Sequence, residues 1–127
     1  MTPAILEHAN ITVTDPEKTA RLLCTLFDWK IRWQGKAIHG GKTIHVGEKN
    51  SYLAVYRGPG DLPDQPASYF MRGGLNHVAV IVDDLEETEQ RVRAAGLTPT
   101  NHADYEPGRR FYFHDHDRIE YEVVCYD

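Results

Sequence analysis

Two histidines occupy equivalent positions in a repeated sequence, and neutral imidazole is a common metal ligand in proteins. At an offset of 69 positions, Leu6, His8, Val13, Asp15, Glu17 and Thr19 recur as Leu75, His77, Val82, Asp84, Glu86 and Thr88. Six identities in fourteen ungapped positions indicate an internal duplication. Two equivalent imidazoles related by a pseudo-two-fold axis would converge near that axis, which is the starting condition for a metal site.

Carboxylates near the end of the chain can complete such a site. In residues 118–124, Glu120 and Glu122 alternate with apolar residues, so the two glutamates share one face of a strand. The same alternation places His8 and His77 opposite the apolar residues that suit packing under a helix. Two histidines and one carboxylate bind a divalent metal and leave positions open for substrate. Alternation alone does not separate Glu120 from Glu122.

The repeat also tests how symmetric this site is. Matching residues 44–46 with residues 111–113 sets an offset of 67 in the late strands, at which Glu120 corresponds to Leu53. Leucine cannot bind a metal, so the predicted site has two histidines, one acid and an apolar fourth corner. Leu53 and Val55 are then expected in the wall of the cleft.

The elements that position these residues follow the duplication. Each copy opens with a β-rich run, at 6–13 and 75–82, and each run ends at an aspartate suited to cap a helix. Helices are expected at 16–28 and 85–95, the second ending before Gly96. Three shorter strands are expected after each helix, at 29–34, 42–48 and 51–57, and at 97–101, 109–114 and 119–126.

The predicted fold is α+β, with two β-α-β-β-β modules that form a curved, partly open barrel-like sheet around a central cleft. The modules span about 3–57 and 74–127, with a Pro- and Gly-rich linker at about 58–73, and together make one domain over residues 1–127. Modules of this type can pair within one chain or between chains, and we expect a homodimer.

Composition narrows the possible partners. The chain of 127 residues is 41% hydrophobic and 26% charged, as in globular proteins, and its net charge of −5 disfavours nucleic acid. No apolar run reaches the ~20 residues of a membrane helix, and the first residues do not resemble a secretory signal. Two cysteines are too few for a disulfide scaffold, so we expect a cytoplasmic protein with a small-molecule substrate.

The chain resembles the vicinal oxygen chelate superfamily, which includes glyoxalase I, extradiol dioxygenases, fosfomycin-resistance proteins and bleomycin-resistance proteins. The resemblance is carried by residues 6–8 with the β run after them, 15–17, 75–80 with Asp84, and 113–120. It implies metal ligands at His8, His77 and Glu120, and so favours Glu120 over Glu122. Glu122 is then interpreted as an acid–base group or a partner that orients a ligand.

Two functions from different classes follow. The first is an enzyme in which Fe, Mn, Zn or Ni chelates two neighbouring oxygens of a small substrate, in lyase, isomerase or dioxygenase chemistry. Glyoxalase I activity is disfavoured, because that family places a metal-binding acid at the position assigned to Leu53. The second is a metal-free module of the bleomycin-resistance type that binds a ligand by aromatic stacking and acidic complementarity.

Other polar residues are weaker candidates for substrate contact. They are His45, Tyr52, His102, Tyr105, Arg109 and Arg110. Residues 114–117 resemble a run of metal ligands but are interpreted as a solvated turn between strands.

Overall fold

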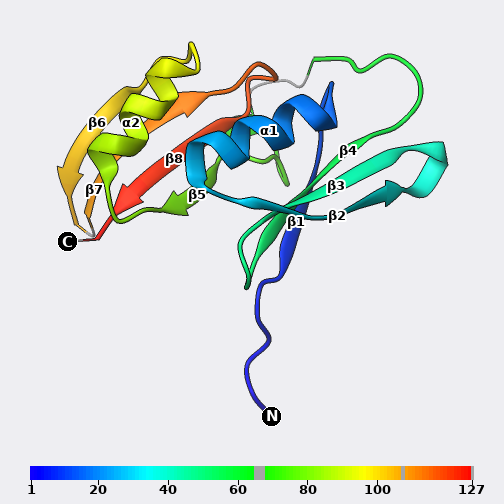
Figure 1. Cartoon of the computed structure of the whole chain (residues 1–127), viewed down its shortest axis with the longest axis horizontal. Coiled ribbons are helices and arrows are strands. Elements are labelled where there is room, and N and C mark those ends of the chain that lie inside the picture. The colour runs from blue at the N-terminus through cyan, green and yellow to red at the C-terminus, as the bar shows by residue number, and fades with distance from the viewer. Residues whose placement is uncertain (65–67, 107, 127) are drawn as a thin grey trace. The chain divides into compact units, whose positions relative to one another are not determined.

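The structure is a computed structural model that describes residues 1–64, 68–106 and 108–126. Residues 65–67 of the predicted linker, and residues 107 and 127 of the predicted second module, lie outside the described residues. The chain divides into two compact units, Met1–Leu62 and Pro63–Asp127. Each unit contains one α-helix and one four-stranded sheet (Figure 1), which confirms the α+β fold and the two β-α-β-β-β modules.

The first unit has strands in the order β1-β4-β3-β2, with β1 parallel to β4 and the other pairs antiparallel. Its elements are β1 (His8–Thr12), α1 (Pro16–Phe27), β2 (Lys30–Lys36), the 3-10 helix η1 (Ile38–Gly40), β3 (Lys42–Gly47) and β4 (Tyr52–Arg57). The side chain of Asp15 caps α1 by accepting a hydrogen bond from the Lys18 amide at 3.2 Å. The predicted cap and the start of the helix at Pro16 are confirmed.

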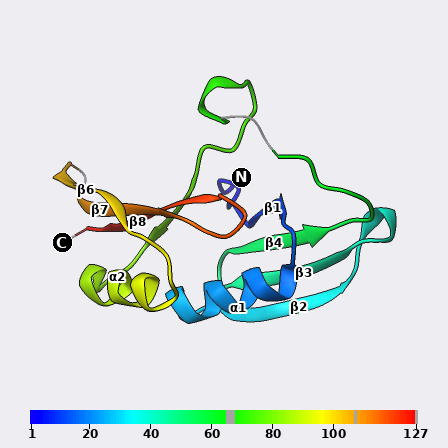
Figure 2. The same ribbon diagram turned by 90° about the horizontal axis from the view of Figure 1, so that it is seen from above.

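Helix α1 covers one face of this sheet (Figure 2). The strand registers place polar and aromatic side chains, among them His8, His45 and Tyr52, on the other face. The buried residues of the helix include Ala20, Leu23 and Leu26, and the sheet contributes Ile44 and Val46, all at most 1% exposed. Burying such side chains is the main favourable term in folding a unit of this size. The face opposite α1 carries the first predicted ligand, His8.

The second unit repeats this arrangement, with strands in the order β5-β8-β7-β6 and β5 parallel to β8. Its elements are the 3-10 helix η2 (Ser68–Phe70), β5 (Val78–Ile81), α2 (Leu85–Ala94), β6 (Thr100–Tyr105), β7 (Gly108–His114) and β8 (Glu120–Cys125). Asp84 caps α2 through a 3.0 Å bond from the Glu87 amide, as predicted. Strand β6 starts at Thr100 rather than at 97, because the Leu97 amide still bonds the Val92 carbonyl of the helix at 3.1 Å.

The core of the second unit is aromatic. Phe111, Phe113 and Tyr121 are fully buried, and the rings of Phe113 and Tyr121 stack with centroids 5.1 Å apart. The turn between β7 and β8 is anchored by Asp115, which is 5% exposed and accepts bonds from the amides of Asp117 and Ile119 at 2.8 and 3.0 Å. The prediction of a solvated turn is therefore wrong at Asp115, whose buried carboxylate holds the turn from inside.

Neither helix in the described part of the chain combines the length and the apolar character that crossing a bilayer requires.

Candidate functional site

The second unit brings His77 together with both candidate glutamates. Strand β5 runs parallel to β8 with Val78 opposite Tyr121, so His77, one residue earlier, lies beside Glu120. His77 Nδ1 is 3.7 Å from Glu120 Oε2, and His77 Nε2 is 3.2 Å from Glu122 Oε1. The imidazole thus lies between two carboxylates, with a different ring nitrogen facing each one.

Glu122 has a strong cationic partner of its own. Arg110 donates from Nη1 to Glu122 Oε2 at 2.7 Å, and the Tyr112 hydroxyl donates to the same oxygen at 3.1 Å. The Arg110 and Glu122 side chains are only 10% and 9% exposed. Desolvation lowers the pKa of Arg110, but the bonds and charge of Glu122 outweigh it and raise that pKa, so the guanidinium stays charged. The negative charge of Glu122 is therefore compensated inside the unit.

Glu120 is surrounded by weaker partners. Tyr69 donates a short hydrogen bond to Glu120 Oε2, and His114 Nε2 lies 3.5 Å from Oε1. No lysine or arginine among the described residues pairs with Glu120. The bond to Glu120, helped by desolvation, raises the pKa of Tyr69 to about 12, so the phenol keeps its proton. Glu120 is thus the carboxylate whose charge is available to a cation.

Tyr69 is a site residue that the sequence did not reveal. It lies in η2, within the predicted linker, and its hydroxyl is also 3.4 Å from His77 Nδ1. A lone tyrosine in a stretch without strand or helix periodicity carries no signal that would mark it.

In the first unit, His8 lies on β1 with one ring nitrogen already engaged. His8 Nδ1 is 2.9 Å from Glu7 Oε1, and this contact lowers the pKa of the Glu7 carboxyl. A carboxylate on one ring nitrogen is the usual support of a metal-bound histidine, and here it leaves Nε2 as the other ring nitrogen. The ring of His8 stacks on Tyr52, with centroids 4.8 Å apart.

The strand pairing corrects the prediction for the fourth position of the ligand set, the residue of the first unit that is equivalent to Glu120. His8 is opposite Tyr52 on β4, just as His77 is beside Glu120 on β8, so Glu120 corresponds to Tyr52 and not to Leu53. The offset changes by one residue because β3 ends at Gly47 and β4 begins at Tyr52, whereas β7 ends at His114 and β8 begins at Glu120.

Leu53 and Val55 therefore do not line the face that carries His8. Both alternate with the residues of that face along β4, and they are 6% and 1% exposed in the core beneath α1. The prediction that they form a wall of the site is wrong.

The described residues contain no single group of three or more His, Cys, Asp or Glu side chains placed to hold a metal ion. The second unit assembles His77, Glu120 and Glu122, and the first unit carries His8. The ligand set of His8, His77 and Glu120 stays a prediction.

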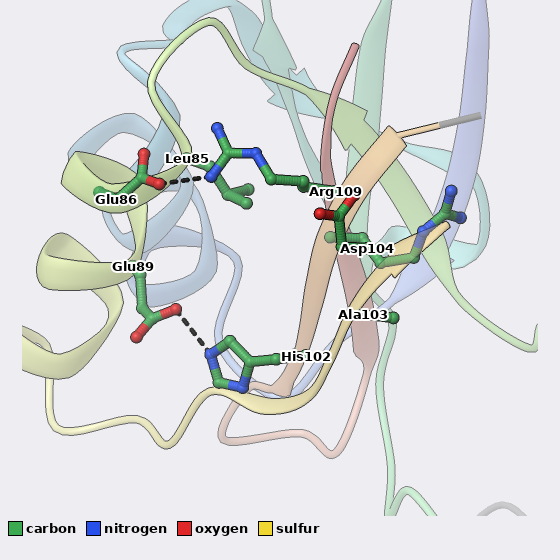
Figure 3. A pocket seen from close by; sticks show the side chains of 8 residues that line it. Leu85, Glu86, Glu89, His102, Ala103, Asp104 and Arg109 are labelled. Carbon is green, nitrogen blue, oxygen red and sulfur yellow. Dashed lines mark hydrogen bonds and ion pairs between the residues drawn. The ribbon is translucent and has the colours of Figure 1, made fainter. Parts of the chain in front are cut away.

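Two further candidates for substrate contact, His102 and Arg109, lie on the side of the second sheet that faces α2. A pocket of about 320 Å³ is found between α2 and strands β6 and β7 (Figure 3). Its lining is Leu85, Glu86, Glu89, His102, Ala103, Asp104, Arg109 and Arg110. His102 Nε2 is 2.7 Å from Glu89 Oε1, and Arg109 pairs with Glu86 (Figure 3). His102 and Arg109 thus fasten the helix to the sheet.

Comparison with known proteins gives a family match and a set of similar folds. A sequence profile described as Glyoxalase/Bleomycin resistance protein/Dioxygenase superfamily matches residues 5–123. No curated protein matches the chain.

Among solved structures, a glyoxylase/bleomycin resistance protein/dioxygenase domain from Frankia sp. EAN1pec is 22% identical, with a TM-score of 0.83 and coverage of 99% of this chain and 100% of that one. A mutant of the genomically encoded fosfomycin resistance protein FosX from Listeria monocytogenes, complexed with Mn(II) and 1S,2S-dihydroxypropylphosphonic acid, is 20% identical, with a TM-score of 0.74 and coverage of 97% and 93%. FosX from Mesorhizobium loti is 22% identical, with a TM-score of 0.71 and coverage of 97% and 92%. At these identities the likeness establishes the fold.

Proposed function

Because the chain belongs to the Glyoxalase/Bleomycin resistance protein/Dioxygenase superfamily, we propose that it is an enzyme that depends on a divalent metal. The metal would be held by His8, His77 and Glu120 and would bind two neighbouring oxygens of a small substrate. One observation carries this proposal: the β5–β8 register sets His77 beside Glu120, an acid that no lysine or arginine of the described chain neutralises.

The donor set fits the proposed ion. Imidazole nitrogen and carboxylate oxygen suit Fe, Mn, Zn and Ni. The Mn(II) in the FosX complex supports a divalent metal on this fold. When bound, the ion would act as a Lewis acid that stabilises negative charge on the substrate oxygens.

The residues around the ligands orient them. Glu7 fixes the ring of His8 through Nδ1, and the Tyr69 hydroxyl holds Oε2 of Glu120. Such supporting bonds limit the rotation of each ligand before the metal binds, which reduces the entropy lost on binding.

Glu122 is the proposed acid–base group. Its Oε2 accepts bonds from Arg110 and Tyr112, so Oε1 is the oxygen that remains to orient His77 or to exchange a proton with the substrate. The proposal covers lyase, isomerase and dioxygenase chemistry, since each of these can use a metal that holds two neighbouring oxygens. Tyr52, at the position equivalent to Glu120, replaces the acid of a four-ligand site and separates the chain from the glyoxalase I pattern.

A metal-free binding module is the second candidate. The observation that favours it is the stack of His8, Tyr52 and His45 on the first sheet, because a row of rings can hold a planar ligand without any metal. Under this function the protein would bind a small molecule and leave it unchanged.

The remaining parts of the proposal concern assembly and location. Strands β1 and β5 lie at the ends of their sheets, and an exposed edge favours pairing, so we include a homodimer in the proposal. Both cysteines are free, which fits the reducing cytoplasm.

The metal content of two glutamine variants tests the proposed function. Untagged Glu120→Gln is expected to lose most of its metal, whereas Glu122→Gln is expected to keep it, because only the Glu120 charge is available to the ion. Loss of metal from Glu122→Gln alone would reverse the assignment, and equal retention in both variants would overturn the metal site in the second unit.

A further inference from the structure

The face of the first sheet opposite α1 carries a row of rings, one from each strand. The His8 ring stacks on Tyr52 at 4.8 Å, Tyr52 stacks on His45 at 4.6 Å, and His45 meets Trp33 at 5.1 Å between centroids. The planes of the first two contacts differ by only 12° and 24°, whereas the Trp33 indole is tilted by 52° from the His45 ring. These side chains share a face because His8 is opposite Tyr52 and Trp33 is opposite His45 in the strand pairing.

A β-bulge adds a positive charge to this row. The pairing of β2 with β3 shifts between Ile31 and Trp33, so Arg32 is the extra residue. A bulge redirects a side chain, and here the Arg32 guanidinium lies 4.4 Å from the centre of the Tyr52 ring. Arg32 donates one bond to the Glu48 carbonyl at 3.3 Å, and no carboxylate in the described part of the chain pairs with it.

A glycine makes room for the outermost ring. A Cβ built on Gly35 would lie 2.8 Å from two atoms of the Trp33 indole, which shows that the indole rests against the bare backbone of β2. Trp33 is 51% exposed, so a large aromatic surface faces outward at the end of the row. An aromatic ring with an exposed face is suited to stacking against a planar molecule.

We propose that the exposed Trp33 indole at the end of this row stacks on the planar, conjugated part of a small carboxylate, and that Arg32 pairs with its acid group. The inference rests on the proposed function only in locating the substrate, since the row begins at the proposed metal ligand His8. It deepens that function by naming the chemical class of the substrate.

The charges along the row indicate where the acid group lies. Glu7, at the β1 end, is already bonded to His8 Nδ1 at 2.9 Å and to the Tyr52 hydroxyl at 3.4 Å. Arg32, on β2, lies close enough to Glu7 to lower the pKa of that carboxyl, but it forms no ion pair among the described residues. A guanidinium matches a carboxylate with two parallel bonds. A ligand carboxylate is therefore drawn to the β2 end, beside Trp33.

Fluorescence of Trp33 gives a direct measurement of this binding. The chain has two tryptophans, so Trp29→Phe leaves Trp33 as the only one. Benzoate, cyclohexanecarboxylate and benzamide would be titrated into this full-length variant, as purified and again after treatment with a chelator. We expect benzoate to bind at least about threefold more tightly than the non-planar acid, because stacking adds to the charge contact. Equal affinity for these two acids would overturn the proposal.

Two further variants test the named residues. Arg32→Gln is expected to weaken benzoate about tenfold while leaving benzamide unchanged, since only benzoate offers a charged partner. Arg21→Gln, which removes the same charge from the exposed side of α1, is the matched control. Gly35→Ala displaces the indole without touching Arg32 and is expected to weaken both planar ligands by a similar factor. Unchanged benzoate affinity in Arg32→Gln would contradict the charge contact.

The metal content of the same samples separates this inference from the proposed function. Benzoate binding by a protein that contains no metal as purified would support the binding at the ring row and contradict the metal-dependent function. A protein that contains stoichiometric metal but shows no preference for benzoate would support the metal-dependent function and contradict the proposed binding at the ring row.

Discussion

Two glutamates on one strand face have received different surroundings, and this difference assigns their roles. Glu122 is held by the Arg110 guanidinium at 2.7 Å, whereas Glu120 meets a neutral phenol and two histidines. Residues of the same type acquire separate functions when a neighbour neutralises the charge of one and leaves the charge of the other available. Alternation along β8 could predict that both glutamates face the same way, but it could not predict Arg110, which comes from another strand.

The Arg110–Glu122 pair gives a prediction about stability. Arg110→Met leaves a buried carboxylate without its cation and is expected to lower the free energy of unfolding, measured with urea. The double variant Arg110→Met, Glu122→Met removes both charges and is expected to recover part of this loss, because two apolar side chains need no partner. A double variant less stable than Arg110→Met alone would contradict this account of the pair.

Asp115 gives a prediction about pH. Burial raises the pKa of this carboxyl, while bonds from the amides of Ile119 and Asp117 partly oppose the shift. A raised folded pKa means that the folded state binds the proton more tightly than the unfolded state. Stability from this group is therefore greatest below the ordinary aspartate pKa of about 3.9 and is lost as the pH rises through the raised folded value.

Asp115→Asn keeps an oxygen for both amides and removes the titration. We expect its stability relative to the natural protein to increase as the pH rises through that window, as measured by thermal unfolding at several pH values. Asp115→Ala is expected to lose about 1–3 kcal/mol throughout, since two amides lose their acceptor. Parallel pH profiles for the natural protein and Asp115→Asn would contradict the raised pKa of this carboxyl.

At the scale of elements, α2 is attached to its sheet partly by charge. Glu89 bonds His102 of β6 at 2.7 Å, in addition to an i,i+4 pair with Arg93 at 3.1 Å. Burial raises the pKa of Glu89, but the bonds from His102 and Arg93 outweigh it and lower that pKa. The stabilisation is therefore present above the ordinary glutamate pKa and is lost as the pH falls through the lowered value.

Glu89→Gln is expected to destabilise the protein by about 0.5–1 kcal/mol near neutral pH, a range typical of partly exposed pairs. Glu87→Gln is the matched control, because Glu87 has an i,i+4 pair with Arg91 at 3.1 Å and no bond from its side chain to the sheet among the described residues. Urea unfolding should show the smaller effect for Glu87→Gln. Equal effects would mean that the bond to His102 adds nothing.

The elements were largely predictable from the sequence, because the duplication and its two capping aspartates define the same local structure twice. The features that the sequence did not predict correctly were also local. One additional residue between β7 and β8 changes the correspondence of Glu120 from Leu53 to Tyr52, and a turn of unknown length conceals such a shift. Tyr69 and the bulge at Arg32 depend on contacts between distant segments, which no sequence periodicity records.

For the whole molecule, a metal held as proposed would link stability to metal concentration, because the unfolded chain offers no preformed set of ligands. At a free metal concentration of about 1,000 times Kd, binding stabilises the folded state by about 4 kcal/mol. Removing the metal with a chelator is expected to lower Tm, and adding it back is expected to restore Tm. A Tm that does not respond to either step would contradict this linkage.

The central claim is that His8 and His77, on different units, hold the same ion with Glu120. The most direct measurement is elemental analysis of the untagged natural protein beside His8→Ala, His77→Ala and His102→Ala, the last being a histidine on the helix side of the second sheet. We expect about one metal ion per chain in the natural protein and in His102→Ala, and a large loss in each of the other two variants. Full metal occupancy in His8→Ala and His77→Ala would contradict the account.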